Sequence, residues 1–417
     1  MWRHYLVRRG VPAVIVVGTL TLFAGARAGA QAPGSKWVTA WGTSQQALGE
    51  TRVSNATVRM IARVTLPGVG IRVRLDNTFG TNALRVGRAS AGVRIQGAAV
   101  AAGSTRPLAF SGSPGVTIPA GGSVWSDAVA LPVLAQQDLA ISLFIPDADV
   151  RPSQHTRGVV TSYRTGDGSG DKVAEEAATA FTTTTSEVWW LKAIDVETVA
   201  SSGAVVAFGD SITDGTCTTL DAHDRWVDVL SVRLALAQGA GMALRSVVNE
   251  GIGGNTVTRK GLTPAPDSPP GLERLERDVL SHHGVTDVVI FMGTNDIRRD
   301  ATAAGVKAGL ADIVSKVRAA GLHTIGVTIV PRHNVAASAG NSGWNDAKTG
   351  IRREVNDWIR RSGAFDRVLD FDAVVRDPEH PDLLQARFNC GDGIHPSPAG
   401  YFALGRSIDL TLFRKGE

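Results

Sequence analysis

The chain has 417 residues, of which 43% are hydrophobic and 20% charged, and its formal net charge is +4. This length favours two or three domains, and the ordinary charge content excludes a collagen, a coiled coil or a mostly disordered chain. The two cysteines are too few for a disulfide-built scaffold or a Cys-rich zinc domain.

The N-terminus has the pattern of a cleavable export signal. Three arginines within residues 1–10 precede an apolar run over 11–24, which is too short to span a membrane comfortably. Ala28 and Ala30 fit the small-x-small cleavage rule, so we expect a signal peptide over 1–30, cut after Ala30. A retained N-terminal anchor is the alternative. The expected location is secreted or periplasmic, with no stable membrane anchor after cleavage, and the choice between Sec and twin-arginine export stays open.

The positive charge comes entirely from this leader. Residues 1–30 contain four arginines, no lysine and no acidic residue, so the remaining chain has 39 basic and 39 acidic side chains. A nucleic-acid-binding protein needs a basic excess or a basic stripe, and the chain has neither. We therefore expect no nucleic-acid partner.

The residues from 36 to 199 show the patterns of short strands. Apolar and β-branched residues alternate with polar ones, as in 71–76, and Gly, Pro and Asn separate the runs. This spacing predicts an all-β sandwich or jelly roll. The Gly-, Ala- and Thr-rich stretch 165–186 is predicted to be a mobile loop with one helical turn near 175–180. The clearest expected strands are 57–66, 71–76, 139–145 and 188–196.

After residue 201 the pattern changes to alternating strands and helices, which is typical of a parallel sheet flanked by helices. We assign this second domain to residues 203–415. The expected strands are 205–208, 244–248, 287–292, 324–330 and 368–370. The expected helices are 226–237, 272–282, 302–320, 344–361 and a last one after Pro398.

Four segments of this second half carry polar or Gly-rich residues where a strand ends or near the C-terminus. They are 209–215, 249–256, 293–296 and 392–396. Each alone has another explanation: a helix cap for the first and third, a phosphate loop for the second, a surface Asp–His pair for the fourth. The second segment, however, lacks the lysine of a Walker A loop and the spacing of a dinucleotide fingerprint.

Together the four segments supply every role that acyl transfer from a serine requires. Ser211 is the candidate nucleophile, His395 its base and Asp392 the partner that orients the base. The backbone N–H groups of Ser211 and Gly254 and the amide of Asn295 are candidate oxyanion donors. No Gly-x-Ser-x-Gly motif occurs, which argues against an ordinary α/β-hydrolase elbow.

At these residues the chain resembles the SGNH (GDSL-type) hydrolase family. The resemblance covers about 203–415 and implies a flavodoxin-like three-layer αβα fold with the roles just given. It also marks supporting residues: Asp210, Asp214, Asn255, Thr256, Asp296 and the pair Arg225-Trp226. The N-terminal part, with Trp37 to Trp41 and Asp76 to Gly80, is similar to the jelly-roll-like domain of secreted bacterial members.

Cys217 lies six residues after Ser211, and Cys390 lies two residues before Asp392. If Ser211 and His395 meet, the two cysteines come into the same neighbourhood, and export favours their oxidation. We predict a Cys217–Cys390 disulfide, with two free buried thiols as the alternative. The nine histidines show no metal-ligand spacing, so we expect no metal and no cofactor.

The predicted function is a secreted serine esterase that works through an acyl-enzyme. Five N-terminal tryptophans favour short acyl groups on carbohydrate, because sugars stack on aromatic faces, although most Trp in a small sandwich belong to the core. The alternatives are a lipase or aryl esterase, and a catalytically silent carbohydrate-binding protein. Acyl length, alcohol and oligomeric state stay open. The tryptophans are Trp37, Trp41, Trp125, Trp189 and Trp190.

Overall fold

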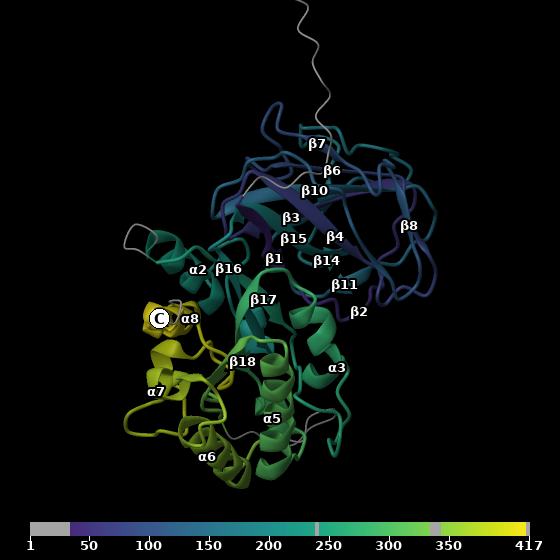
Figure 1. The fold of residues 1–417 in the computed structure, drawn as a ribbon. Coiled ribbons are helices and arrows are strands. Elements are labelled where there is room, and N and C mark those ends of the chain that lie inside the picture. The colour runs from purple at the N-terminus through teal and green to yellow at the C-terminus, as the bar shows by residue number, and fades with distance from the viewer. Residues whose placement is uncertain (1–33, 238–241, 334–342, 414–417) are drawn as a thin grey trace, which may run out of the picture.

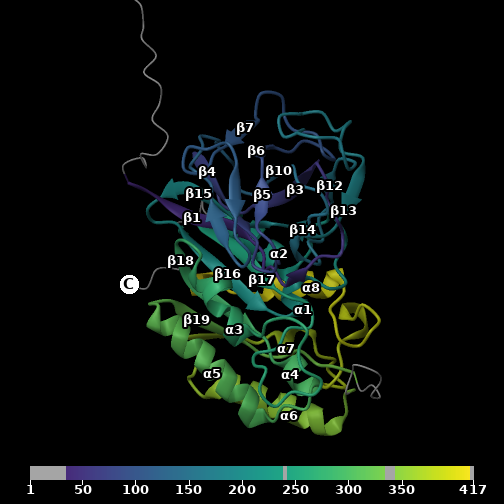
Figure 2. The same cartoon turned by 90° about the vertical axis from the view of Figure 1, so that its right-hand side faces the viewer.

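The computed structural model describes residues 34–237, 242–333 and 343–413. The expected signal peptide and its cleavage site lie outside the described residues. No described helix combines the length and the apolar character needed to cross a bilayer. Figures 1 and 2 show a β-rich N-terminal part packed on a C-terminal part in which helices cover a central sheet.

The N-terminal part is built from antiparallel sheets that enclose a common core. Along β4 (Gly70–Asp76), Ile71 and Val73 are fully buried while Arg72 is partly exposed, as the alternating pattern predicts. Two larger sheets form the sandwich. One has the order β1 (Ser35–Gly42), β15 (Leu191–Val199), β4, β9 (Ser123–Trp125). The other has the order β13 (Thr183–Thr185), β12 (Ser162–Arg164), β3 (Ala56–Val64), β10 (Gln137–Ile145), β6 (Arg88–Val93), β7 (Arg106–Leu108).

Two smaller sheets complete this part. They are β14 (Val188–Trp189), β11 (Ser153–His155), β2 (Ala47–Leu48), and the pair β5 (Leu84–Val86), β8 (Val116–Ile118).

Two predictions in this region were wrong in detail. The stretch 165–186 contains strand β13, which pairs with β12, and no helical turn forms near 175–180. The expected strand 188–196 is split because Trp190 has a φ of +57°, which turns the backbone out of the extended conformation between β14 and β15. Its indole is fully buried, so core packing holds this unfavourable backbone geometry in place.

The C-terminal part has a five-stranded parallel sheet with helices on both faces. In sheet order the strands are β17 (Arg245–Gly251), β16 (Gly203–Gly209), β18 (Val285–Phe291), β19 (His323–Val327) and β20 (Arg367–Leu369). Counted along the chain this is the order 2-1-3-4-5, which is flavodoxin-like. In such sheets ligands bind where the strand order reverses, and here that point is the carboxyl end of β16.

Two apolar layers fix the helices to this sheet (Figure 1). One layer holds α2 (Trp226–Ala237), α7 (Phe371–Val375) and α8 (Pro398–Ser407). The other holds α3 (Gly271–Leu275), α5 (Ala303–Ala319) and α6 (Asp346–Arg361). The helix expected over 272–282 begins as α3 and continues as a π-helical turn, Glu276–Leu280. Short 3₁₀ turns occur at Ala386–Phe388 and Leu410–Phe413.

The N-terminal part covers the open edge of the parallel sheet at β17. The Thr65 hydroxyl accepts from the Val247 N–H at 3.0 Å, and the Ser246 hydroxyl donates to the Thr39 carbonyl at 2.6 Å. Val38 and Val248 belong to one continuous apolar core. An exposed edge strand is therefore avoided, because the sandwich occupies that side.

Candidate active site

The candidate nucleophile sits directly after the central strand. β16 ends at Gly209, and the single-turn helix α1 (Ser211–Asp214) begins two residues later. Asp210 caps this helix, because its Oδ1 accepts the N–H of Ile212 at 3.0 Å. Gly215, with a φ of +103°, ends the helix after one turn. Ser211 is thereby held at a helix start, where backbone N–H groups lack helical partners.

The three predicted triad residues come together. Ser211 Oγ lies 2.9 Å from His395 Nε2, and His395 Nδ1 lies 2.5 Å from Asp392 Oδ2. The chain of contacts runs from hydroxyl to imidazole to carboxylate, as serine activation requires. Asp392 is the most exposed of the three, with 39% of its side chain accessible.

Local hydrogen bonds fix the orientation of Asp392. Its Oδ1 accepts the backbone N–H groups of Ile394 and His395, both at 2.8 Å, while Oδ2 faces the imidazole. Burial alone would raise the pKa of Asp392. The hydrogen bonds from His395 and Ile394 outweigh burial and hold this pKa well below its usual range. The carboxylate is therefore charged at neutral pH and faces Nδ1 of His395.

The expected oxyanion donors occupy three neighbouring strand ends, those of β16, β17 and β18. The backbone N–H groups of Ser211 and Gly254 donate to no backbone carbonyl among the described residues. Asn295, on helix α4 (Thr294–Arg298), donates one amide hydrogen to the Asn255 carbonyl at 3.0 Å, which leaves its second N–H available. Gly254 has a φ of +72°, a conformation that favours glycine.

Asn255 and Asp296 hold these donors in place rather than facing the nucleophile. Asn255 donates to Ser268 Oγ and the Pro269 carbonyl. Asp296 accepts the N–H groups of Val257 at 2.9 Å and Thr258 at 3.2 Å, so it joins the loop after β17 to α4. Burial raises the pKa of Asp296 to about 7 and that of Asp210 to about 6.

Arg274 links several parts of the site, and the motifs did not point to it. Its guanidinium donates to the carbonyls of Gly209 and Glu250 and to Asn255 Oδ1, at 2.9 to 3.0 Å. The side chain is fully buried, and its position one turn before Asp278 looks like an ordinary surface pair in the sequence.

The interface between the two parts contributes a buried group of charges, which we call the interdomain charge cluster. Lys192 of β15 contacts Glu250 at 2.8 Å and Asp278 at 2.9 Å, and all three side chains are 0% exposed. Burial opposes ionisation, but Lys192 holds the pKa values of Glu250 and Asp278 below their usual range. Every charge in the cluster thus has an opposite charge beside it. Its members are Lys192, Glu250, Arg274, Arg277, Asp278 and His282.

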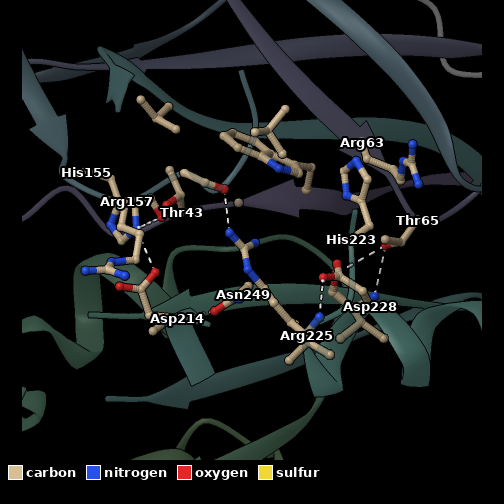
Figure 3. A pocket seen from close by; sticks show the side chains of 18 of the residues that line it. Thr43, Arg63, Thr65, His155, Arg157, Asp214, His223, Arg225, Asp228 and Asn249 are labelled. Atoms are coloured by element: carbon tan, nitrogen blue, oxygen red, sulfur yellow. Dashed lines mark hydrogen bonds and ion pairs between the residues drawn. The ribbon is translucent and has the colours of Figure 1, made fainter. Parts of the chain in front are cut away.

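Asp214, at the end of the nucleophile helix, is bound by a histidine of the N-terminal part (Figure 3). His155 Nε2 lies 2.9 Å from Asp214 Oδ1, and its Nδ1 lies 2.8 Å from the Ser44 carbonyl. Both nitrogens face acceptors, an arrangement in which the protonated ring donates from both of its N–H groups. Burial lowers the pKa of His155, but Asp214 overcomes it and raises that pKa above its ordinary value.

The remaining predicted supporting residues act in the scaffold. Thr256 donates to the Thr258 carbonyl at 2.8 Å, and Arg225 contacts the Gly158 carbonyl across the interface. Trp226 is fully buried and packs edge-on against Phe371.

The predicted disulfide is present between Cys217 and Cys390, whose Cα atoms are 6.2 Å apart. It joins the segment after the nucleophile helix to the segment that carries Asp392 and His395. Cys217, Asp392 and His395 group closely enough for a metal site, but the disulfide occupies the sulfur and the other two are the triad. This donor set therefore does not fit a metal.

The tryptophans are not arranged as a sugar-stacking platform. Trp189 and Trp190 are buried. Arg72 lies over the rings of both Trp37 and Trp125, with 4.9 Å to each centroid. Trp41 lines a cavity of about 50 Å³ between the two parts, shown in Figure 3. A volume of this order holds a water molecule or two rather than a sugar.

Comparison with known proteins supports an ester hydrolase. Residues 207–403 match the model of the GDSL-like lipase/acylhydrolase family. No curated protein sequence matches the chain.

Solved structures resemble the C-terminal half. They include a carbohydrate acetylesterase from Sinorhizobium meliloti (18% identity, TM-score 0.39, 49% of this chain and 95% of that one). Others are the M. smegmatis aryl esterase (21%, 0.39, 49% and 95%) and a GDSL-like lipase from Bacteroides thetaiotaomicron (20%, 0.35, 49% and 84%). The C-terminal part of this chain thus belongs to the GDSL-like lipase/acylhydrolase family, and the enzyme is a serine hydrolase of ester bonds.

Proposed function

We propose that Ser211 is the nucleophile of this esterase and forms an acyl-enzyme. The observation that carries the proposal is the continuous contact from Ser211 Oγ through His395 to Asp392. His395 takes the hydroxyl proton as Ser211 attacks the ester carbonyl, and it returns that proton to the leaving alcohol. A water molecule then attacks the acyl-enzyme with the same histidine as base, which releases the acid and restores Ser211.

The negative charge of the tetrahedral intermediate falls on the former carbonyl oxygen. In this proposal the N–H groups of Ser211 and Gly254 and the second amide hydrogen of Asn295 receive it. Their support is their origin from three adjacent strand ends and, for Asn295, an anchoring bond to Asn255 that fixes the amide before substrate arrives. Donors that need no reorganisation stabilise the transition state most.

For the substrate we propose short acyl groups on carbohydrate or similar alcohols. The catalytic half contains no long apolar segment that could act as a lid over a lipid chain. The tryptophans do not add support, because they are buried, stacked on Arg72 or turned into the interdomain cavity. A lipase or aryl esterase is the alternative, and it differs in acyl-length preference.

We also propose that the protein is exported and cut after Ala30. The Cys217–Cys390 disulfide supports an oxidising location, since such bonds are rare in reducing compartments. N-terminal sequencing of the exported protein tests this directly, and a mature chain that starts at Met1 would contradict it.

The nucleophile is tested by Ser211→Ala, with the exposed Ser169→Ala as the matched control. We expect kcat on p-nitrophenyl acetate to fall about 10⁴- to 10⁶-fold in the first variant and to stay unchanged in the second. A serine-directed phosphonate should label Ser211 in the parent only. Near-normal turnover of Ser211→Ala would end the proposal. A panel of acetyl to dodecanoyl esters, beside acetylated polysaccharides, separates the short-acyl proposal from the lipase alternative.

A further inference from the structure

Three arginines gather at the same sheet edge as Ser211. Arg298 and Arg299 end helix α4, whose first turn carries Asn295. Arg332 follows β19, the next strand of the sheet. We call Arg298, Arg299 and Arg332 the arginine cluster. The carboxyl ends of parallel strands meet at one edge, so α4 and the segment after β19 lie on the substrate side of the sheet.

Arg332 is tied to the catalytic segment through its neighbour. The backbone N–H of His333 donates to the Gly393 carbonyl at 2.7 Å, within the segment that carries Asp392 and His395. The guanidinium of Arg332 lies over the Trp344 ring, 5.2 Å from its centroid. This contact places the planar cation on an aromatic surface and fixes its orientation.

Arg332 is buried without an ionic partner. The residue is 3% exposed, and its Nε is buried with no hydrogen bond. Across the described ranges, no carboxylate or carbonyl accepts from its guanidinium. Arg299 Nε and Nη1 are likewise buried with no hydrogen-bond partner. The acid nearest to its guanidinium, Asp267, is 3.7 Å away and fully exposed. Buried charges are normally paired, so unpaired ones indicate a site for an opposite charge.

The surroundings do not neutralise this positive charge. Burial and the neighbouring Arg298 lower the pKa of Arg332 to about 10, although Asp210 and Asp392 act against this. Both acids already have other bonds: Asp210 caps α1 and Asp392 holds His395. By contrast, the equally buried Arg352 contacts Asp372 at 2.6 Å and Asp382 at 2.9 Å. The arginine cluster thus keeps donors that a ligand can use.

We propose that the arginine cluster, with Arg332 at its centre, binds an anionic group of the ester substrate beside the scissile bond. The inference rests on the proposed function and narrows its substrate class to acylated molecules that also carry a carboxylate or a phosphate, such as an acetylated uronic-acid polymer. The planar fork of an arginine matches both anions in a bidentate manner. Neutral acetylated glycans are then the poorer substrates.

The test compares matched esters that differ only in the anion. Phenyl acetate, 4-acetoxybenzoate and 4-acetoxyphenyl phosphate place no charge, a carboxylate or a phosphate on the leaving group. Acetylated xylan and acetylated pectin repeat the comparison on neutral and acidic polymers. We expect the parent enzyme to favour the better anionic member at least tenfold in kcat/KM, and the preference to shrink as salt is added. Whichever ester, the carboxylate or the phosphate, exceeds phenyl acetate more in kcat/KM identifies the anion that the site binds.

Arg332→Met should remove the preference: kcat/KM should fall at least tenfold more on the anionic esters than on phenyl acetate. Arg332→Lys should recover part of it. The matched control is the exposed Arg387→Met, in the segment before Cys390, which removes the same charge and should leave the preference intact. Equal rates on charged and neutral esters in the parent would overturn the proposal, as would an equal loss on both in Arg332→Met.

A binding measurement separates this inference from the esterase proposal itself. Benzoate and inorganic phosphate should raise the melting temperature of Ser211→Ala, and Arg332→Met should abolish that shift. If neither anion shifts the melting temperature while the parent hydrolyses phenyl acetate, the anion site is wrong and the esterase stands. If the anions bind but no ester turns over, the site stands and the proposed function fails.

Discussion

The interdomain charge cluster and the arginine cluster treat buried guanidinium groups in opposite ways: the first pairs them with acids, and the second leaves them without a close acidic partner. Arg274 makes hydrogen bonds to two catalytic segments, 209–215 and 249–256, and an ion pair with Asp278. Arg332 makes none among the described residues. A cluster in which acids and bases are paired leaves no uncompensated charge for a ligand and serves to join the two parts. An unsaturated one costs stability unless a ligand completes it. Pairing, rather than burial or charge alone, distinguishes the two.

The largest effect is expected in the interdomain charge cluster. Lys192→Met removes the cation between Glu250 and Asp278 and leaves two carboxylates buried together. Breaking such a pair costs about 3–5 kcal/mol of unfolding free energy. Urea unfolding measures this, and kcat of the fraction that remains folded should change little. Lys307→Met, at a partly exposed pair with Glu354, is the control and should cost less than about 1 kcal/mol. Equal losses in the two variants would contradict the stabilising role assigned to the buried pairing of Lys192.

The next largest effect is expected at Asn295. Asn295→Ala should lower kcat by about 10²–10³ if its amide receives the oxyanion, while KM changes little. Asn356→Ala provides the contrast, because this buried amide bonds the backbone of Ile329. That variant should lose stability and keep its kcat. A rate loss in Asn356→Ala as large as that in Asn295→Ala would show that scaffold damage, rather than oxyanion binding, explains the effect.

The Cys217–Cys390 disulfide attaches the segment after the nucleophile helix covalently to the segment that carries Asp392 and His395. Replacing Cys217 and Cys390 together by serine should cost about 2–4 kcal/mol of unfolding free energy, because the unfolded chain regains freedom over a long loop. Thermal unfolding with and without reductant measures the effect on the parent. A reductant-insensitive melting temperature in the parent, identical to that of the double variant, would contradict it.

The smallest effect concerns His155 and depends on pH. Burial lowers its folded pKa and Arg225 acts in the same direction, but Asp214 outweighs both and raises that pKa above its ordinary value. The stabilisation is therefore complete below the unfolded pKa of about 6.5 and is lost as pH rises through the higher folded pKa. At pH 6, His155→Gln should cost about 1.5–3 kcal/mol, the worth of a hydrogen bond to a charged group. Melting temperatures from pH 6 to 9 should converge for parent and variant, and parallel curves would refute the prediction.

Sequence patterns predicted the catalytic half well because its chemistry sits at strand ends. Ser211, Gly254 and Asn295 each follow a buried strand, and the ends of adjacent parallel strands have to meet. The pairing of Cys217 with Cys390 follows from the same placement, whereas the flavodoxin-like strand order was implied by the family resemblance. The short helices α1 and α4 were not foreseen as elements, since one turn carries no periodic signal.

Lone charged residues were missed for a different reason. Lys192 alternates with apolar neighbours in β15, and such a pattern normally marks a solvated face. The face is buried because a second part of the chain covers it, which no local pattern reports. His155 is similar, since it belongs to a three-residue strand whose partner, Asp214, lies 59 positions later in the sequence. Arg332 belongs to no motif. It was recognised only because the structure shows its buried guanidinium without an ionic partner among the described residues.

The Cys217–Cys390 bond also has a topological consequence. It closes a ring of chain that contains β17 to β20, Gly254 and Asn295, while Ser211 and His395 lie just outside its two ends. A single backbone cut anywhere between the two cysteines therefore leaves one covalent molecule, with nucleophile and base still joined across the bridge. After such a cut, reduction of the disulfide separates them.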